Sequence, residues 1–368
     1  MVYLVVFTIS ILLVYIAEHE KKNRKRLCIT CIAIMVPVFL AALRNESVGH
    51  DVLLYQKPIY IAAIRSASVF SYMNMPFVKQ VEPLYALFTY IGSVIGTIQM
   101  VFFLNELLIV ATTFVTIWHF RDQVPAYQSW SCFLFTYYMY GLNITRQSMA
   151  MSVVLLSWMY LDKKKYINAI IVVLFAVGFH SSAVVGFGII ILYVASKSAL
   201  RWVHMLAVTV AIFLSVFLFR EVFVWTVKTF SFLPDRYIMT RVLYLDRGVD
   251  FLFSKFFYVL VVMVVMAGVF LTNNNTKMRD GDFLLYMTIL SLGGVTVGSQ
   301  AQFAYRIFLY PELFTIFAMP MMFRLTTKNK LSIILTHFLF YSVIISYWWF
   351  NFVYKNNGEM YPYSLFGA

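Results

Sequence analysis

The sequence predicts an all-α fold, that of a polytopic integral membrane protein. The chain is 62% hydrophobic, its mean hydropathy is +0.80, and only 12% of its residues are charged. Soluble globular chains are about 45–50% apolar and about 25% charged. Many apolar runs approach the roughly 20 residues that span the hydrocarbon as a helix. We therefore expect about 12 to 13 membrane segments in one helical bundle, forming a single transmembrane domain over residues 1–368.

The positive charges indicate how the chain is oriented. The formal net charge is +13, and about half of the lysine and arginine residues fall in five short loops. Such loops are typical of the cytoplasmic side of a membrane protein, so the charge reflects topology, and no nucleic-acid partner is expected. The loops cover residues 18–26, 162–165, 197–201, 273–282 and 324–330.

The first part of the chain contains two predicted helices and a long external segment. Apolar runs at about 2–17 and 27–43 flank the first basic loop. Because the basic cluster follows the first run, we expect a retained helix and no cleaved signal peptide. An external loop is expected over about 44–81, followed by apolar segments at about 82–98 and 102–118.

One apolar segment between residues 52 and 141 is expected not to cross the membrane. If every apolar run crossed, the lysine loop at 163–165 would lie outside, against the preference of lysine for the cytoplasm. The best candidate is the segment near 82–98, which is short, begins with Glu82-Pro83 and contains Gly92 and Gly96. These features suit a re-entrant segment.

After residue 163 the predicted helices cross the membrane alternately. Their approximate bounds are 166–179, 183–196, 202–219, 256–272, 283–298, 307–323 and 331–350, with a second external loop at about 220–255 and a tail, 354–368, that ends outside. This topology puts a mixture of cationic, acidic and histidine side chains on the external side, so we expect the chemistry to face outward. These residues are Arg44, Asp51, Glu82, Arg146, His180, Arg236, Arg241, Asp246 and Arg306.

Three early residues could carry chemistry or only stabilise the fold. Arg44, at a helix end, could be an anchor that extends to the membrane interface, and Asp51, after Gly49, could be a turn residue. Glu82 could open a helix, where an acid is favoured. In a protein-lined cavity its pKa could instead rise, which would suit a general acid or base.

The stretch at 140–183 is the expected centre of a functional site. Asn143, Arg146 and Gln147 lie close together in otherwise apolar sequence, and polar groups are costly inside a membrane. They could pack helices together, or Arg146 could bind a phosphate through its planar guanidinium. His180 could be a packed hydrogen-bonding residue or a proton-transfer group.

Later polar residues leave similar alternatives open. Arg236 and Arg241 could lie on a solvated loop or contact a sugar phosphate. Tyr305 and Arg306 could line the same cavity as the earlier residues, because Arg306 is poorly spaced to pair with Glu312 within one helix.

The sequence offers little support for a cofactor or a metal. Asp280-Gly281-Asp282 resembles an Asp-x-Asp metal motif, but its basic neighbours and its predicted cytoplasmic side favour a solvated loop. Cys28 and Cys31 have no second cysteine pair, so we interpret them as small packing residues. The sequence has no glycine-rich phosphate loop and no metal triad, which argues against ATP-driven or zinc chemistry. No cofactor and no metal ligands are expected.

The order of these motifs resembles the EpsG-like branch of the bacterial Wzy polymerases, which join the repeat units of O-antigen and exopolysaccharide. The chain departs from the family pattern at His50 and at Thr145. The resemblance is carried by Arg44, Gly49-x-Asp51-x-x-x-Tyr55, Glu82-Pro83, Ile144-Thr145-Arg146-Gln147 followed by Ala150, the lysine loop and Phe179-His180-x-Ser182-Ala183, with weaker similarity at Tyr305-Arg306, Tyr310 and Tyr361-Pro362-Tyr363.

The resemblance implies a metal-independent glycosyltransferase in the bacterial inner membrane, with its active site facing the periplasm. The growing glycan would move from undecaprenyl pyrophosphate onto the sugar of a new lipid-linked repeat unit. Donor and acceptor would both be lipid-linked oligosaccharides held in the bilayer. A chain-length regulator and a repeat-unit flippase are the candidate protein partners.

The resemblance also implies roles for individual residues. Fixed cations would stabilise the departing pyrophosphate, and a base would accept the proton of the attacking hydroxyl. For the base, His180 is the first candidate and Glu82 or Asp51 the second. The candidate substrate-binding residues are Arg146, Arg306, Arg44, Arg241, Asn143, Gln147 and Tyr305.

Three other functions fit a protein of this class. A flippase or transporter of lipid-linked oligosaccharide would favour charge pairs near the middle of the membrane and a repeat between the two halves of the chain; the sequence has no such repeat, and its polar residues crowd one side. An O-antigen ligase would also use external arginines and a histidine. A structural scaffold is the third alternative.

Overall fold

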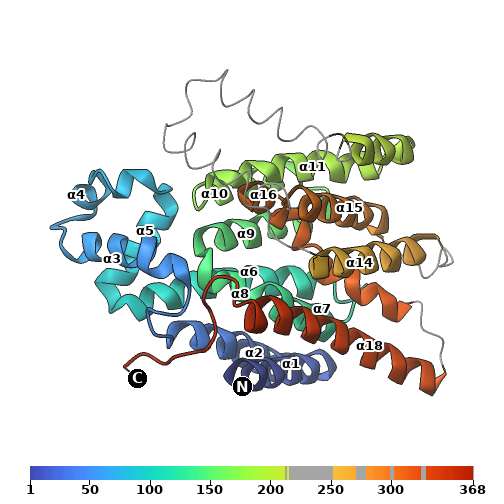
Figure 1. Ribbon diagram of the computed structural model, residues 1–368, viewed down its shortest axis with the longest axis horizontal. Coiled ribbons are helices and arrows are strands. Elements are labelled where there is room, and N and C mark those ends of the chain that lie inside the picture. The colour runs from blue at the N-terminus through green and yellow to red at the C-terminus, as the bar shows by residue number, and fades with distance from the viewer. Residues whose placement is uncertain (212–213, 215–251, 271–278, 299–301, 325–328, 368) are drawn as a thin grey trace. The chain divides into compact units, whose positions relative to one another are not determined.

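The structure is a computed structural model that describes residues 1–211, 214, 252–270, 279–298, 302–324 and 329–367 (Figure 1). These residues form two compact units. Unit 1 comprises Met1–Phe187 and Phe340–Ala368, and unit 2 comprises Gly188–Leu339. Each unit is described by itself. The described residues are helical apart from turns and an isolated β-bridge.

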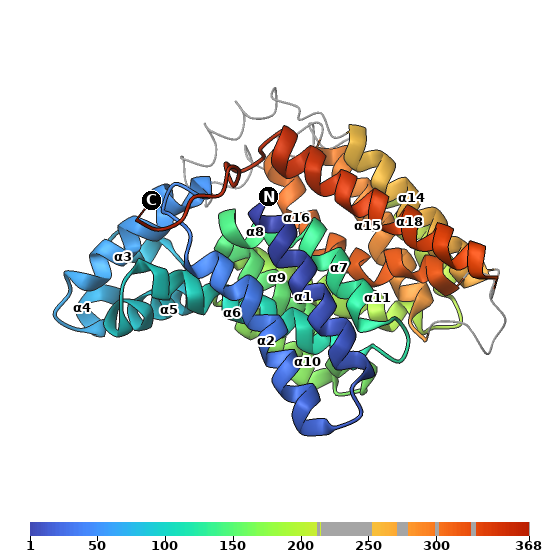
Figure 2. The same cartoon turned by 90° about the horizontal axis from the view of Figure 1, so that it is seen from below.

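Unit 1 begins with two neighbouring helices, α1 (Val2–His19) and α2 (Asn23–Ala42), shown side by side in Figure 2. Tyr3 and Phe7 of α1 are buried, whereas Val5 and Leu12 are exposed. A helix that is apolar on its exposed face as well as its buried face is typical of a membrane span. Both helices match the predicted segments to within a few residues.

The segment expected as an external loop at 44–81 is largely helical. It contains a π-helix (Val52–Gln56), α3 (Lys57–Ile64), α4 (Val69–Met73) and a short 3₁₀ turn (Val78–Gln80). These elements gather around α5 (Pro83–Ile95) in Figures 1 and 2. The prediction of a loop missed these helices because each is short and depends on packing for its stability. One such contact joins α4 to α5, where the ring centroids of Tyr72 and Tyr90 lie 5.4 Å apart.

The segment expected to be re-entrant forms α5, a helix of 13 residues. At about 1.5 Å per residue it is about 20 Å long, whereas the hydrocarbon core is about 30 Å thick. It ends at Gly96 and is followed by α6 (Ile98–His119), which is long and apolar enough to span a membrane. The short length of α5 is what a re-entrant segment requires, and re-entry stays a prediction.

The centre of unit 1 is built from α6, α7 (Ala126–Thr136), α8 (Tyr138–Asn143), α9 (Thr145–Asp162) and α10 (Tyr166–Val177). Helix α9 contacts α6 and α10, and Figure 1 shows it between them. Most side chains of α9 are buried. The core of the unit therefore surrounds the helix that begins with Thr145-Arg146.

Unit 2 contains most of α11 (Val185–Ser196), a helical stretch at 201–211, α14 (Leu252–Phe270), α15 (Gly281–Gly298), α16 (Gln302–Glu312), α17 (Thr315–Ala318), a 3₁₀ helix (Met319–Arg324) and the start of α18 (Lys330–Trp348). The run predicted as one helix at 307–323 is divided after Glu312, where α16 ends. A π-helix (Trp349–Tyr354) follows α18 in unit 1. Most of the predicted external loop at 220–255 lies outside the described residues.

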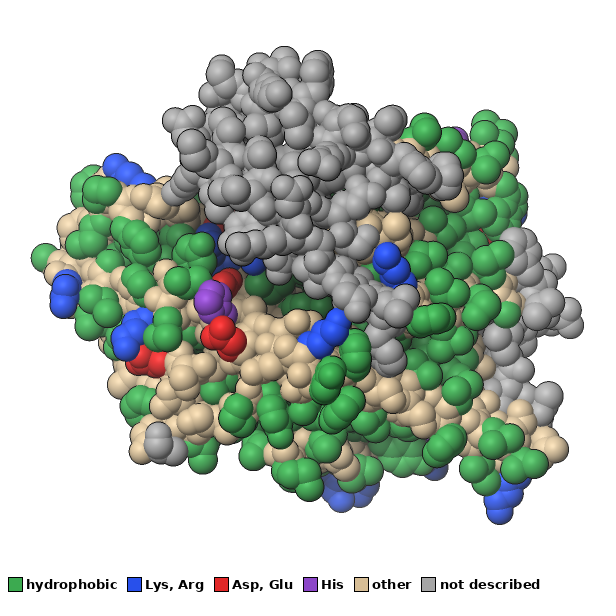
Figure 3. Space-filling model, in the orientation of Figure 1, with side chains coloured by type: hydrophobic (Ala, Val, Ile, Leu, Met, Phe, Trp, Pro, Cys, Tyr) green, Lys and Arg blue, Asp and Glu red, His purple; other side chains and the backbone are tan. Residues whose placement is uncertain are grey.

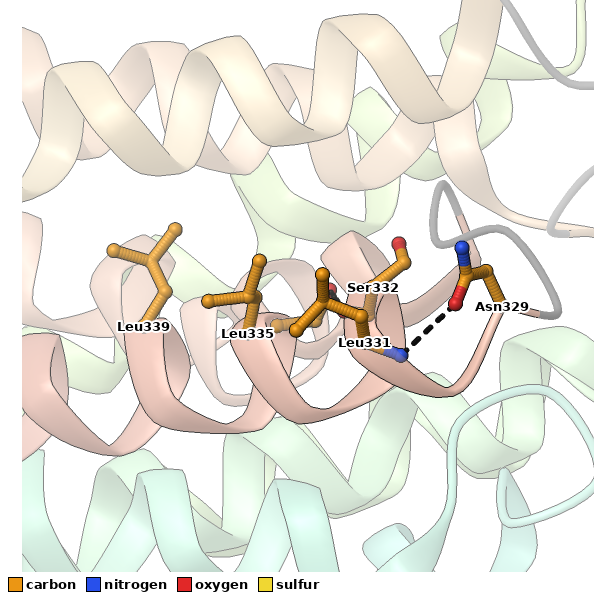
Figure 4. Close-up of a pocket in the computed structure, with 6 residues that line it drawn as sticks. Asn329, Leu331, Ser332, Leu335 and Leu339 are labelled. Atoms are coloured by element: carbon orange, nitrogen blue, oxygen red, sulfur yellow. Dashed lines mark hydrogen bonds between the residues drawn. The ribbon is translucent and has the colours of Figure 1, made fainter.

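The helices define the class of protein: an all-α, polytopic membrane protein. Six described helices are long and apolar enough to span a membrane, and five shorter helices are apolar. Hydrophobic side chains cover much of the described surface in Figure 3. Figure 4 shows a shallow pocket at the start of α18, where Leu331, Leu335 and Leu339 make up half of the lining residues. Such a surface suits lipid chains, and none of the candidate site residues lines it.

Two interpretations of polar sequence are wrong. Asp280 is not in a solvated loop: it is buried and paired with Lys197, and Asp282 pairs with Arg201 at 3.1 Å. A carboxylate can be buried there because a cation accompanies it. The cysteines of α2, Cys28 and Cys31, are exposed and do not pack in the core.

Candidate functional site

The polar residues of the central stretch lie at one end of a helical hairpin. Helices α9 and α10 are neighbours joined by the short lysine loop at 163–165. Arg146 is in the first turn of α9, and His180 follows the last turn of α10. Both residues are therefore at the end of the hairpin opposite the lysines.

An ion pair joins this end of the hairpin to the start of α5. Arg146 Nη1 donates a hydrogen bond of 2.8 Å to Glu82 Oε2, and the side chains of the two residues are 21% and 16% exposed. The second carboxylate oxygen, Oε1, accepts a hydrogen bond of 3.0 Å from the Ser181 N–H. Glu82 thus connects the start of α9 with the turn after α10.

The local sequence explains why Glu82 reaches both partners. Pro83 occupies the first turn of α5, where a missing N–H is tolerated, and Glu82 precedes it in an extended conformation. The Leu84 N–H donates to the Gly178 carbonyl at 2.9 Å. A Cβ at Gly178 would come within 2.5 Å of the Leu84 side chain, so glycine permits the close approach.

Two tyrosine rings flank the guanidinium of Arg146. Its Cζ lies 5.1 Å from the ring centroid of Tyr55 and 5.9 Å from that of Tyr85. Tyr55 is exposed and Tyr85 is buried. Cation–π contacts at these distances favour a fixed position for the cation, so the carboxylate and the two rings together hold Arg146 in place.

The electrostatics of Glu82 differ from the sequence-based expectation. Burial opposes ionisation of the carboxyl, but Arg146, the Ser181 N–H and the nearby His180 ring outweigh it, and the pKa of Glu82 lies below its ordinary value. The suggestion that this pKa could rise is therefore wrong. An ionised carboxylate with hydrogen bonds to both oxygens is better suited to position Arg146 than to exchange a proton.

Thr145, where the chain departs from the family pattern, is a buried hydrogen-bonding residue. Its hydroxyl donates to the Gly141 carbonyl at 2.7 Å and accepts from Gln56 Nε2 at 2.8 Å. These bonds tie the π-helix that carries Tyr55 to the break between α8 and α9. The threonine therefore helps to bring Tyr55 and Arg146 together.

His180 interacts with the turn that follows it. Its Nδ1 accepts a hydrogen bond of 3.2 Å from the Ser182 N–H and lies 2.6 Å from Ser182 Oγ. An Nδ1 that accepts from the backbone carries no proton, so the neutral ring has its proton on Nε2. His180 is also close enough to Glu82 to act on that carboxyl electrostatically.

Asp51 and Asn143 lie in direct contact. The Asp51 N–H donates a hydrogen bond of 3.0 Å to Asn143 Oδ1, and both residues are half-buried. Asp51 interacts electrostatically with Tyr85, as Arg146 and Arg44 also do. Asp51 therefore belongs to the same neighbourhood as Arg146, and Asn143 supports its backbone.

Arg44 is buried, with 1% exposure, so it does not extend to the membrane interface. Its guanidinium lies 4.3 Å from the ring centroid of Phe102. Burial lowers the pKa of this guanidinium from its ordinary value, and Glu106 of α6 acts in the opposite direction. The backbone of Arg44 forms a β-bridge with Leu365 of the C-terminal tail. Arg44 is therefore enclosed within unit 1, and its expected role in substrate binding stays a prediction.

The other candidate residues are divided between the two units. Gln147 is buried in unit 1. Tyr305 and Arg306 belong to unit 2, where Tyr305 donates to the buried Glu312 at 2.7 Å and Arg306 is exposed. Arg236, Arg241 and Asp246 lie outside the described residues.

Sequence reasoning underestimated several residues that complete the site. Tyr85 follows Glu82 by three residues and therefore shares its helical face. Ser181 contributes through its backbone, which no side-chain pattern can reveal. The tail was expected to end outside and to carry a weak family similarity at Tyr361-Pro362-Tyr363, but its contacts near Asp51 were not expected, although Asn357-Gly358 is a recognised turn signal.

The site and fold together describe a polytopic membrane protein with a supported arginine at the end of a hairpin opposite its lysine loop. The profile of the EpsG family matches residues 27–365, and the chain belongs to this family. The resemblance inferred from the sequence is thus confirmed. The comparisons found no match among curated proteins and none among solved structures.

Proposed function

We propose that this protein polymerises bacterial surface polysaccharide. It transfers the growing glycan from undecaprenyl pyrophosphate onto a hydroxyl of a new lipid-linked repeat unit, at the outer face of the inner membrane. Membership of the EpsG family supports polysaccharide synthesis by a membrane protein. The lipid-linked donor and acceptor and the outward orientation are parts of the proposal.

The observation that carries the proposal is the fixed position of Arg146. A guanidinium has five N–H donors, and in the described part of the chain one of its nitrogens, Nη1, binds Glu82. The remaining donors can bind a phosphate. When the bond between the anomeric carbon and pyrophosphate breaks, the leaving group keeps the electron pair. A cation that is already in place stabilises this charge without reorganisation.

The attacking hydroxyl must lose a proton as its oxygen bonds to the anomeric carbon. We assign the base to Asp51 in preference to His180. The lone pair of His180 Nδ1 already accepts from Ser182, and Glu82 is committed to Arg146 and Ser181. Asp51 hydrogen-bonds through its N–H to Asn143, three residues before Arg146, and the charges of Asp51 and Arg146 both act on Tyr85.

Elongation by purified protein tests the function. In sealed proteoliposomes with a synthetic lipid-linked repeat unit and without ATP, the wild type should make longer glycans. Asp51→Asn should reduce kcat by about 10²- to 10⁴-fold, as expected on loss of a general base, and His180→Asn should reduce it less. Movement of the lipid across the bilayer without elongation would show that the protein is a flippase and not a polymerase. Equal kcat in Asp51→Asn and the wild type would exclude the assigned base.

A further inference from the structure

The C-terminal tail lies against the segment that leads to Asp51. In Figures 1 and 2 the end of the chain runs beside the segment between α2 and α3. The Phe366 N–H donates to the Leu43 carbonyl and the Asn45 N–H to the Ser364 carbonyl, each at 2.8 Å. These bonds surround the Arg44–Leu365 bridge. Backbone groups more than 300 residues apart are therefore paired in a short antiparallel contact.

A second set of bonds lies next to Asp51. The Gly49 N–H donates to the Glu359 carbonyl and the His50 N–H to the Gly358 carbonyl, both at 3.0 Å. Gly49 and Gly358 have φ values of +99° and +86°, which favour glycine. The tail thus binds two consecutive amides immediately before Asp51.

The tail also maintains its own shape at this point. The Asn356 side chain donates to the Tyr361 carbonyl at 2.6 Å and accepts from the Tyr361 N–H at 3.0 Å. The Tyr3 hydroxyl of α1 donates to the Met360 carbonyl at 2.7 Å. The segment that contacts Gly49 and His50 is therefore supported from within and by α1.

Asn143 is the point where the tail, the turn before Asp51 and the end of α8 meet. Its Oδ1 accepts from the Asp51 N–H. A Cβ added at Gly358 would lie 2.4 Å from Asn143 Nδ2. The Asn143 side chain thus binds the backbone of Asp51 and occupies the space that a side chain at position 358 would need.

We propose that Gly358, Glu359 and Asn143 form a clamp that positions Asp51. This inference rests on the proposed function, in which Asp51 is the base. A base must lie within hydrogen-bonding distance of the proton it accepts, and a displacement of about 1 Å can cost about 10²-fold in rate. Three backbone amides in succession, Gly49, His50 and Asp51, are bound by the clamp. In this proposal the clamp residues act through Asp51, so Asn143, which the sequence analysis expected to bind substrate, is assigned a positioning role.

A matched pair of glycine substitutions tests the clamp. Gly358 and Gly367 both have positive φ, +86° and +81°, so alanine strains the backbone similarly at each. The alanine methyl of Gly358→Ala would press on Asn143 Nδ2, whereas that of Gly367→Ala would meet nothing within 4 Å. Gly358→Ala should lower kcat about 10- to 100-fold and leave KM for the lipid-linked acceptor within about twofold. Gly367→Ala should match the wild type. Equal kcat in the two variants would overturn the clamp.

Two further measurements separate the possible failures. Hydrogen exchange at the Gly49, His50 and Asp51 amides should be faster in Gly358→Ala than in Gly367→Ala, a readout that requires no activity. If Gly358→Ala does not fold, Asn143→Ala removes the same contact by deletion and should give the same loss of kcat and faster exchange at Asp51. Unchanged exchange would reject the clamp even if the chain is no polymerase. A wild type that fails to elongate glycan would reject the function alone.

Discussion

At the scale of single residues, Glu82 and Arg146 fix each other's position and charge state. The carboxylate is ionised because a guanidinium and a backbone N–H bind it, although burial acts against ionisation. The guanidinium is fixed in turn by the carboxylate and by two aromatic rings. Each group explains the state of the other.

The geometry of the pair predicts the effects of two conservative substitutions. Arg146→Lys keeps the charge but loses the planar fork, and we expect kcat for glycan elongation to fall about 10²- to 10³-fold. Glu82→Gln keeps the size of the side chain but loses the charge-assisted bond, and a smaller fall of about 10-fold is expected. The matched control is Arg121→Lys, at an exposed arginine just beyond the end of α6. If Arg146→Lys behaved like this control, the guanidinium would have no special role.

The lowered pKa of Glu82 predicts how stability depends on pH. The unfolded carboxyl titrates near about pH 4.3. A group whose folded pKa is lower stabilises the fold fully above the unfolded pKa, and this contribution is lost as pH falls through the folded pKa. The wild type should therefore have a higher melting temperature than Glu82→Gln between about pH 8 and about pH 6. The difference between the two melting temperatures should shrink below about pH 4. Thermal unfolding followed by intrinsic fluorescence would measure it, and a constant difference to lower pH would contradict the assignment.

The buried hydroxyl of Thr145 offers a test of stability that is independent of catalysis. Thr145→Val has nearly the same shape but leaves Gln56 Nε2 without its acceptor. Loss of a partner by a buried polar group costs about 1–3 kcal/mol. Thr145→Ser keeps the hydroxyl and is the control. Unfolding free energies that are equal in the two variants would show that the bond contributes nothing.

At the scale of elements, the site is formed where short helices meet long ones. Helix α5 brings Glu82 to the end of the α9–α10 hairpin, and the π-helix at Val52–Gln56 brings Tyr55. Neither element is long enough to cross the hydrocarbon. Short helices that stop part of the way through a bilayer can present their ends to a protein-lined space.

The length of α5 predicts that its two ends open to the same compartment. The chain has three cysteines, so a background with Cys28, Cys31 and Cys132 replaced by serine permits site-directed labelling. New cysteines at Val81 and Thr97 should both react with a membrane-impermeant maleimide applied from outside intact cells. A cysteine at Lys164 should react only after the membrane is opened. Labelling of Thr97 only after opening would show that α5 crosses.

At the scale of the whole molecule, composition and charge were sufficient to predict an all-α membrane protein, and the order of the motifs predicted its family. Helix bounds followed from the apolar runs, as for α1 and α15, because length and hydropathy decide a membrane span. The arrangement of Glu82, Arg146 and Ser181 could not be predicted, because it depends on contacts between residues 64 and 99 positions apart. The tail was missed for a similar reason: it binds the N-terminal half through backbone groups, which leave no mark on side-chain patterns.

The structure gives two candidate residues surroundings that differ from those expected. Arg44 was expected to bind substrate; the structure buries it against Phe102, and a binding role for it stays a prediction. Glu82 changed from a candidate acid or base to a partner of Arg146, because its pKa is lowered. Charge and spacing selected Glu82 and Arg146, which the structure pairs, and their roles in catalysis stay predictions.

The most direct test of the account is the binding of undecaprenyl pyrophosphate to the protein in nanodiscs. We predict that Arg146→Ala weakens binding at least about tenfold, since a charge-assisted bond to phosphate is lost, while Arg121→Ala binds as the wild type does. Equal affinity in all three proteins would contradict the claim that Arg146 receives the pyrophosphate.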